Sequence, residues 1–331
     1  MDTDTFKRQY ADILRRYLRG ISYQTLSCVY DPSIEKAVVR HFRTLNFSTD
    51  FVERIMPIIH ASAWIATSTY SFTPPNVQEA IAIYTSLAIA IEDTSKEYTD
   101  DLESFQLRLF NRQPQPNQLL QAMVDFIDVL RGIYGPFACD MIAKSTAEFI
   151  SICAFERKYG GTLRPSSSSP DFPYYLRLKT GVAEVYAFFA FPEVLYLEDA
   201  FLHVYIVAIP DIARYLNLGN DLLSFYKESI VSDERLNYIY NHSRASNSTP
   251  LQSIWSTHLA LITCVQNIRK TLSTSPQTWR NIDQLINGYV MYHFGASRYK
   301  LSDLGIGEVD EVRAKVCCPT TVDNEIGTHE H

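Results

Sequence analysis

The hydrophobic positions of this chain repeat with a helical period nearly throughout. Apolar side chains from Ala80 to Ile91 form the broad face of a helix that we expect to run from Asn76 to Asp93, with Asn76 as its N-cap. No strand–turn–strand signal and no internal repeat are found. Further helices are expected at residues 117–131, 136–159, 172–189, 198–229, 249–272 and 277–298. The pattern therefore predicts an all-α protein.

Proline and glycine set most of the expected boundaries. Gly160 and Gly161 end one helix, Gly181 weakens the next, and Pro210 is expected to kink the long helix 198–229. The charged, proline-containing segment 94–117 is expected to be a loop. We predict one helical domain over residues 20–305, with a segment 1–19 before it and a polar, mobile tail at 306–331.

Composition and charge narrow the possible functions. The net charge of −7 provides no basic surface, which argues against nucleic-acid binding. The longest mostly apolar run, residues 80–91, is too short to span a bilayer. The charged N-terminal residues lack the apolar core of a signal peptide, and the six cysteines show no zinc-ligand spacing. We therefore expect a cytoplasmic protein with reduced thiols and no membrane span.

The most informative segment is residues 220–228, in which Asn220, Ser224 and Glu228 are spaced at i, i+4 and i+8. On an α-helix this spacing places three oxygen-bearing side chains on one face, a turn apart. Their neighbours are apolar, so the polar face needs a partner. Mg²⁺ prefers oxygen ligands and would satisfy them. A solvated face of an amphipathic helix is the alternative.

A second acidic cluster, residues 92–97, ends the apolar helix that begins near Asn76. Carboxylates at a helix C-terminus oppose the negative end of the helix dipole, and a bound cation would offset this. A helix end that frays into a charged loop is the alternative. Two such helices facing each other would form a metal clamp for a diphosphate.

Together the strings Asp93-Thr94-Ser95-Lys96-Glu97 and N-D-x-x-S-x-x-x-E at 220–228 resemble the fungal trichodiene synthase family of class I terpene cyclases. The resemblance implies a single-domain helical bundle around an apolar cavity. It covers residues 50–305. The family's first motif usually opens with two aspartates, whereas Thr94 follows Asp93 here. Either Asp93 takes the first metal-bridging position or Glu92 and Asp93 act as the acidic pair. We prefer Asp93, because Ser95 and Lys96 then align.

The resemblance also implies which residues bind the diphosphate. Arg177 lies 43 residues before Asn220, where the family has a diphosphate-sensing arginine. Lys227 matches the family's diphosphate-binding lysine, and Arg298-Tyr299 matches its Arg-Tyr pair. A guanidinium suits this role because it can hold two phosphate oxygens and stays protonated. Three Mg²⁺ ions are expected, held near Asp93 and by the residues of the second motif.

Aromatic side chains are expected to line the cavity, because their π faces stabilise a carbocation without capturing it. The chain has 21 Tyr, 18 Phe and 3 Trp residues, which is more than a core requires. We name Tyr292 as a cavity wall, because it lies two helical turns before Arg298, where the resemblance implies an aromatic pocket wall, with Trp64 and Tyr84 as weaker candidates. Plain core packing is the alternative for each.

These observations predict a Mg²⁺-dependent sesquiterpene synthase. It would ionise farnesyl diphosphate and cyclise it to a cyclic hydrocarbon or alcohol, with Asp93, Arg177, Lys227, Arg298 and Tyr299 in the catalytic machinery. A homodimer is expected from the family. One alternative is a chain-elongating prenyltransferase, which would need a second aspartate-rich motif late in the chain. The other is a helical isoprenoid-binding protein without catalysis.

Overall fold

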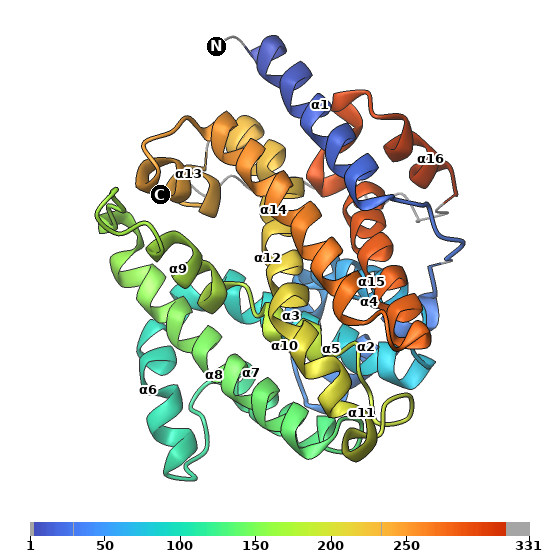
Figure 1. Ribbon diagram of the computed structural model, residues 1–331. Helices are drawn as coiled ribbons and strands as arrows, with labels where there is room; N and C mark the ends of the chain where they lie inside the picture. The colour runs from blue at the N-terminus through green and yellow to red at the C-terminus, as the bar shows by residue number, and fades with distance from the viewer. Residues whose placement is uncertain (1–2, 29, 233, 316–331) are drawn as a thin grey trace.

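The computed structural model describes residues 3–28, 30–232 and 234–315, and these residues form a bundle of α-helices (Figure 1). No β-strand occurs in these three ranges, which confirms the all-α prediction. The helices are α1 (Thr3–Ile21), α2 (Pro32–Thr44), α3 (Thr49–Arg54), α4 (Met56–Thr69), α5 (Pro75–Thr94), α6 (Thr99–Phe110), α7 (Gln118–Leu130), α8 (Pro136–Tyr159), α9 (Phe172–Thr180), α10 (Ala183–Phe188), α11 (Glu198–Tyr205), α12 (Ile209–Phe225), α13 (Tyr238–Ala245), α14 (Pro250–Thr271), α15 (Pro276–Gly295) and α16 (Gly307–Lys315). Short 3₁₀ segments are η1 (Ser95–Glu97), η2 (Gly160–Thr162), η3 (Ile206–Ala208), η5 (Ser297–Tyr299) and η6 (Leu301–Leu304), and η4 (Tyr226–Val231) is a π-helical segment.

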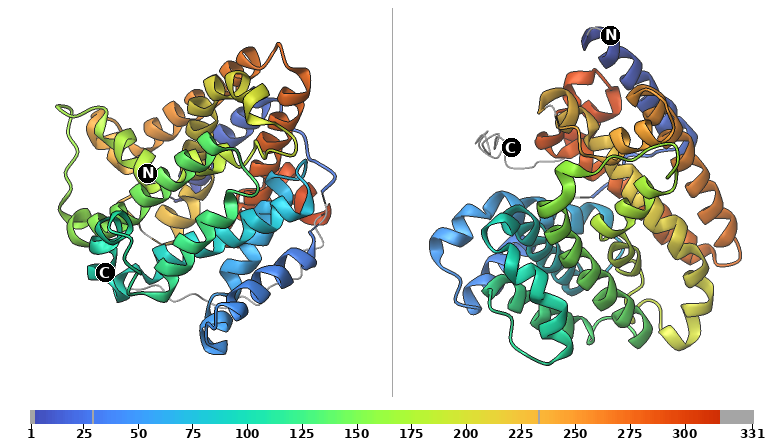
Figure 2. Two further views of the ribbon diagram at one scale, coloured as in Figure 1. Left: turned by 90° about the horizontal axis from the view of Figure 1, so that it is seen from below. Right: turned by 90° about the vertical axis from the view of Figure 1, so that its left-hand side faces the viewer.

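Two helices that carry the predicted motifs lie inside the bundle, as the views in Figure 2 show. Helix α5 packs against α2, α4 and α7, and α12 packs against α10, α14 and α15. Because neighbours cover several sides of each helix, both are apolar around most of their circumference rather than along one stripe. This burial fixes the positions of the polar residues at their ends.

Several expected helices have the predicted bounds. Helix α8 runs from Pro136 to Tyr159, and the Glu198 carboxylate accepts hydrogen bonds from the backbone N–H groups of Phe137 and Ala138 at its start. The prediction for Asn76 was wrong. Helix α5 begins at Pro75, with Pro74 at the N-cap, because proline suits the first turn, where no N–H has an intrahelical partner.

Three other predictions were wrong in their local structure. The expected loop 94–117 contains α6, whose Leu102 and Phe105 are buried. The expected helix 172–189 breaks at Gly181-Val182, and Val182 has a left-handed φ of +49°. Pro210 does not kink a continuous helix: it lies in the first turn of α12, after α11 and η3. In the last two cases glycine or proline marked a helix break or a helix start rather than a bend within one helix.

Helical structure continues on both sides of the predicted domain 20–305. Helix α1 packs against α14, and its Tyr10, Leu14 and Tyr17 are fully buried. Helix α16 packs against α15, with Val309 and Val312 buried. The core therefore includes most of the expected N-terminal segment and the first part of the expected tail. Residues 316–331 of that tail lie outside the described residues.

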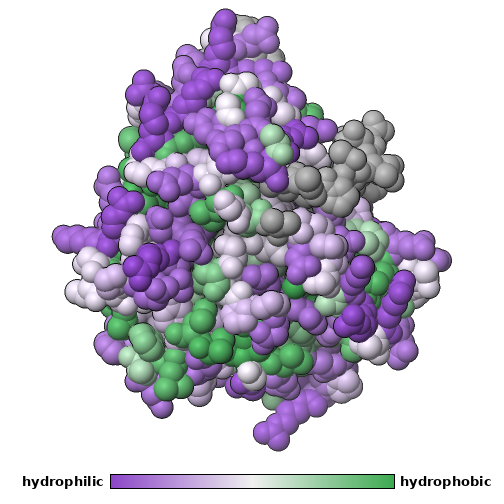
Figure 3. All heavy atoms as spheres, turned by 90° about the vertical axis from the view of Figure 1, so that its right-hand side faces the viewer, coloured by the Kyte–Doolittle hydropathy of each residue, from purple (hydrophilic) through white to green (hydrophobic). Residues whose placement is uncertain are grey.

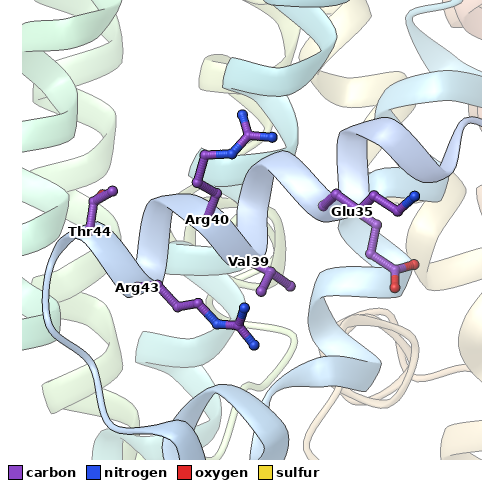
Figure 4. Close-up of a pocket in the computed structure, with 6 residues that line it drawn as sticks. Glu35, Val39, Arg40, Arg43 and Thr44 are labelled. Carbon is purple, nitrogen blue, oxygen red and sulfur yellow. The ribbon is translucent and has the colours of Figure 1, made fainter.

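The surface has an apolar region and a hollow that lie outside the predicted motifs. Figure 3 shows a largely hydrophilic face with apolar side chains gathered in its lower part. A hollow of about 450 Å³ lies along α2 and is lined by Glu35, Lys36, Val39, Arg40, Arg43 and Thr44 (Figure 4). None of these residues belongs to the predicted motifs. No described helix is long and apolar enough to cross a membrane.

Candidate active site

Polar side chains follow one face of α12 in an otherwise apolar helix. Asn220 is half-buried, whereas Asp221 and Ser224 are buried. The Ser224 Oγ is buried and has no hydrogen-bond partner among the described residues. Leaving a buried hydroxyl unpaired costs about 1–3 kcal/mol. The fold therefore keeps an oxygen at this position that a bound group can use.

Arg177 reaches from α9 to this face. Its Nε donates to both carboxylate oxygens of Asp221, at 2.9 and 2.8 Å. Its Nη2 donates to the carbonyl oxygen of Asn217 at 3.3 Å and to Oδ1 of Asn220 at 3.1 Å. Burial raises the pKa of Asp221 to about 6, although Arg177 acts in the opposite direction. A Cβ at position 181 would lie 1.8 Å from the Asn217 Oδ1, so this close approach requires Gly181.

Lys227 and Glu228 lie in the π-helical segment η4, directly after α12. Asn220 and Ser224 are one regular turn apart, as predicted, but the wider turn changes the direction of Glu228 relative to them. Such segments occur frequently at functional sites. Burial lowers the pKa of Lys227, and the charge of Arg298 lowers it further. This segment also contacts η5, which contains Arg298.

The other acidic cluster lies at the C-terminal end of α5. Arg157 of α8 caps this end: its Nε donates to Ser95 Oγ at 2.7 Å, and its Nη2 donates to the carbonyl oxygen of Glu92 at 3.3 Å. The Ser95 hydroxyl donates to the same carbonyl at 2.6 Å. The positive charge of Arg157 interacts favourably with the negative end of the helix dipole. Because Arg157 binds a hydroxyl and a backbone carbonyl, the carboxylates of Glu92 and Asp93 remain available for other ligands.

The two clusters share one electrostatic environment. Burial and the charge of Asp93 raise the pKa of Glu92 to about 7, while Arg177 and Arg298 oppose this shift. Burial also raises the pKa of Asp93, against the charges of Arg298 and Lys227. Glu92 and Asp93 are nevertheless exposed, so the shift in their pKa values comes from protein atoms crowded around the carboxylates rather than from complete exclusion of water. The charges of Arg177, Lys227 and Arg298 therefore act on the carboxylates at the end of α5.

Arg298 and Tyr299 lie in η5, beyond the end of α15 at Gly295, rather than on the helix itself as predicted. The Arg298 guanidinium is 5.6 Å from the centre of the Tyr299 ring. The Tyr299 hydroxyl donates to the Tyr292 hydroxyl at 3.3 Å, and the two rings are 5.8 Å apart. The exposed arginine is thus attached to the bundle by a buried tyrosine beside it.

The aromatic residues expected to form a cavity wall are all buried. Trp64 of α4 donates from Nε1 to the carbonyl oxygen of Tyr292 at 3.1 Å, which joins α4 to α15. Tyr84 of α5 shares a 2.7 Å hydrogen bond with Thr146 and meets Phe189 edge to face at 5.1 Å. Their polar atoms are therefore satisfied within the bundle, and their contact with a cavity stays a prediction.

The donor set fits a hard cation. Asn220, Ser224 and Glu228 supply only oxygen atoms, which Mg²⁺ prefers. In the three described ranges, no group of three or more His, Cys, Asp and Glu side chains could hold a metal ion. The unpaired buried Ser224 Oγ is the structural observation that favours a ligand here.

Sequence reasoning missed three residues of this region. Asp221 lies within the second motif, and it holds Arg177 rather than pointing to solvent. Arg157 and Glu156 of α8 reach the site from a helix that had no predicted part in it. Burial raises the pKa of Glu156, and its charge raises that of Glu92. Arg157 and Glu156 belong to no local motif, so the sequence contained no signal that pointed to them.

Comparisons with known proteins identify the family of the chain. Residues 8–317 match the family described as trichodiene synthase (TRI5), and the chain belongs to this family of terpene synthases. It is 82% identical, over the whole of both chains, to an (E)-beta farnesene synthase of Metarhizium brunneum. It is 29% identical to terpene synthase BipA of Cochliobolus sativus, over 87% of this chain and 88% of that one.

A solved structure supports the fold. The crystal structure of a-eudesmol synthase matches with a TM-score of 0.57 and 16% sequence identity, over 81% of this chain and 97% of that chain. This likeness shows the class I terpene synthase fold alone. The prediction of a terpene synthase, a lyase acting on a diphosphate, is confirmed by the family match and the farnesene synthase relative.

The predicted cyclic product was wrong. The relative with 82% identity is named for (E)-β-farnesene, and this sesquiterpene is acyclic. The motifs report how the diphosphate is bound and released, whereas the contour of the cavity decides whether the chain of carbon atoms folds onto itself. The motif resemblance therefore had no information on cyclisation.

Proposed function

We propose that this protein converts farnesyl diphosphate into (E)-β-farnesene and diphosphate in the presence of Mg²⁺. The observation that carries the proposal is the 82% identity to an (E)-beta farnesene synthase, which extends over the full length of both chains. At this identity, and with no part of either chain left uncovered, the shape of the cavity is expected to be shared. The oxygen donors and cations at the end of α12 support the same chemistry.

In this proposal Asn220, Ser224 and Glu228 hold one part of a group of three Mg²⁺ ions, and Asp93 holds the other. When bound, the metal ions neutralise the charge that develops on the departing diphosphate. Two observations support these assignments. The Ser224 Oγ is buried and unpaired, and Arg157 binds Ser95 and the Glu92 carbonyl rather than the carboxylate of Asp93. Glu228 is the only carboxylate of the three residues from the second motif, so it supplies their negative charge.

The proposed diphosphate ligands are Arg177, Lys227, Arg298 and Tyr299. Arg177 holds Asp221 through Nε, and its Nη2 contacts are longer, at 3.1 and 3.3 Å. The guanidinium can therefore turn part of its donor edge to phosphate oxygens. Lys227 and Arg298 come from the contacting segments η4 and η5, so their charges converge on one group. Closure of this region around the substrate would exclude water.

The reaction breaks the bond between C1 of the farnesyl chain and its oxygen, and the electron pair leaves with the diphosphate. The allylic cation then loses a proton from the methyl group on C3, and the electron pair of that C–H bond forms the terminal double bond. The released diphosphate can accept the proton, so no protein base is required. Tyr292, Trp64 and Tyr84 are proposed to line the cavity, where aromatic faces stabilise the cation.

Incubation of the purified protein with farnesyl diphosphate and Mg²⁺, followed by gas chromatography with mass detection, tests the proposal. We expect (E)-β-farnesene as the main volatile product and none when Mg²⁺ is chelated. A cyclic hydrocarbon, or longer prenyl diphosphates on addition of isopentenyl diphosphate, would contradict it. Glu228→Ala is expected to lower turnover about 10³-fold, which is ~4 kcal/mol of barrier, and unchanged turnover would exclude the metal role of this residue.

A further inference from the structure

We propose that His293 is a positioning residue that fixes the orientation of the Asn220 amide, and with it the direction of a metal-binding oxygen. The proposal rests on the proposed function of Asn220 as a metal ligand. His293 belongs to neither sequence motif. It lies on α15 and is completely buried beside the end of α12.

The hydrogen bonds of His293 define which of its nitrogen atoms carries the proton. Nδ1 is 2.8 Å from the carbonyl oxygen of Tyr289, one turn earlier on the same helix. A carbonyl oxygen only accepts, so Nδ1 carries a hydrogen atom. No carboxylate among the described residues forms a hydrogen bond or ion pair with this buried ring, so the ring is neutral and its Nε2 has a lone pair that can accept.

This lone pair faces Asn220. Nε2 of His293 is 3.5 Å from Nδ2 of Asn220, so the amide nitrogen donates and the imidazole accepts. On the other side of the amide, Arg177 can only donate, and its Nη2 donates to Oδ1 of Asn220 at 3.1 Å. Both neighbours therefore require the same orientation, in which Oδ1 faces the cationic side of the site and Nδ2 faces the core.

The ring of His293 is itself held firmly. It lies 4.7 Å from the ring of Tyr289, 4.9 Å from that of Tyr292 and 4.6 Å from that of Tyr299. His293 thus joins Asn220 of the second motif to Tyr299, beside the proposed diphosphate ligand Arg298. A partner behind a ligand that fixes its direction typically contributes about tenfold or more to metal affinity.

Two substitutions separate the two hydrogen bonds of this residue. His293→Asn keeps a donor at the position of Nδ1, for the Tyr289 carbonyl, but it is too short to reach Asn220. His293→Gln places an amide oxygen near the position of Nε2, where it can accept from Asn220. We expect Mn²⁺ alone, titrated by the electron paramagnetic resonance signal of the free ion, to bind about tenfold more weakly to His293→Asn than to the wild type. For His293→Gln we expect a change of less than about threefold.

A double substitution and a matched control complete the test. In an Asn220→Asp background the carboxylate has no Nδ2 donor, so adding His293→Asn should weaken Mn²⁺ binding less than about twofold further. His258 is 2% exposed, lies on α14 and likewise bonds to a carbonyl of its own helix, that of Trp255. His258→Asn should leave Mn²⁺ affinity unchanged even if it lowers the melting temperature.

The outcomes distinguish this inference from the proposed function. Equal Mn²⁺ affinities of His293→Asn and His293→Gln, or a loss that persists at full size beside Asn220→Asp, would overturn the positioning role. A wild-type protein that releases no farnesene from farnesyl diphosphate would overturn the proposed function instead. As a second measurement, we expect His293→Asn to raise the Mg²⁺ concentration needed for half-maximal turnover, while the KM for farnesyl diphosphate changes less.

Discussion

The ends of α5 and α12 carry the two polar clusters of the site, and they differ in how far the protein has fixed them. At α12 the amide, carboxylate and hydroxyl are at least half-buried, and Arg177 and His293 hold the amide and the carboxylate from two other helices. At α5 the carboxylates of Glu92 and Asp93 have solvent-accessible area. Arg157 there holds the backbone rather than the acids.

This difference indicates a division of roles. The α12 cluster is preorganised. Its unpaired hydroxyl and its buried ion pair lower the stability of the folded protein before any ligand binds. The α5 cluster is positioned as a unit, but its carboxylates are left to adjust. We expect changes at α12 to affect folding and catalysis together, and changes at α5 to affect mainly the binding of metal ions and substrate.

The largest effect on stability is expected for Arg177→Met. The side chain of Arg177 is 13% exposed and that of its partner Asp221 is 7% exposed, so the substitution leaves a buried carboxylate unpaired. We expect a loss of about 3 kcal/mol in the free energy of unfolding, measured by urea denaturation. The double variant Arg177→Met/Asp221→Leu should recover most of this loss but no activity. A single variant as stable as the wild type would contradict the buried ion pair.

Ser224→Ala is expected to act on stability and catalysis in opposite directions. Removal of an unpaired buried hydroxyl should raise the free energy of unfolding of the metal-free protein by about 1 kcal/mol. The same change removes a proposed metal ligand, so turnover of farnesyl diphosphate should fall about 100-fold. Lower stability together with normal turnover would show that the hydroxyl serves the fold instead.

Arg157→Met tests the α5 side of the comparison. We expect a loss of about 1 kcal/mol in stability, because hydrogen bonds to Ser95 and to a helix-terminal carbonyl disappear. The concentration of Mg²⁺ for half-maximal turnover should rise several-fold. The neighbouring Lys158→Met is a suitable control, since it removes an exposed ion pair with Glu103 that contributes less than about 1 kcal/mol. Equal effects of both variants would argue against a specific role of Arg157.

The smallest expected effect is on the pH dependence of stability without metal. The pKa values of Glu92 and Glu234 are both raised from 4.5 to about 7, mainly because protein atoms crowd their carboxylates, although both residues are exposed. The folded protein therefore binds more protons than the unfolded chain between these pH values, and its stability falls as the pH rises through about 7. Melting temperatures measured from about pH 5 to about pH 8 should show this decrease. A combined Glu92→Gln/Glu234→Gln variant should have a flatter profile, and an unchanged slope would exclude these two groups as its cause.

The sequence predicted those parts of the fold and site that depend on local patterns. The period of apolar residues predicted the all-α class, Pro136 and Gly160 predicted the bounds of α8, and the spacing of Asn220 and Ser224 placed them on one face of α12. The π-helical segment that redirects Glu228 was not predicted, because its residues also suit a regular helix. Arg157 and His293 were not predicted because their partners are 62 and 73 residues away. Such contacts depend on how the helices pack.

Helix α1 reaches the site from behind, and this has a practical consequence. The Tyr10 hydroxyl donates to the carbonyl oxygen of Leu222, and its ring stacks near Tyr226 at 6.5 Å. A version of the enzyme trimmed to begin near residue 20 would lose the support behind Ser224 while retaining every motif residue. Versions that lack α1 should therefore be avoided when the enzyme is produced for synthesis, because they would lose the contacts of Tyr10 with Leu222 and Tyr226.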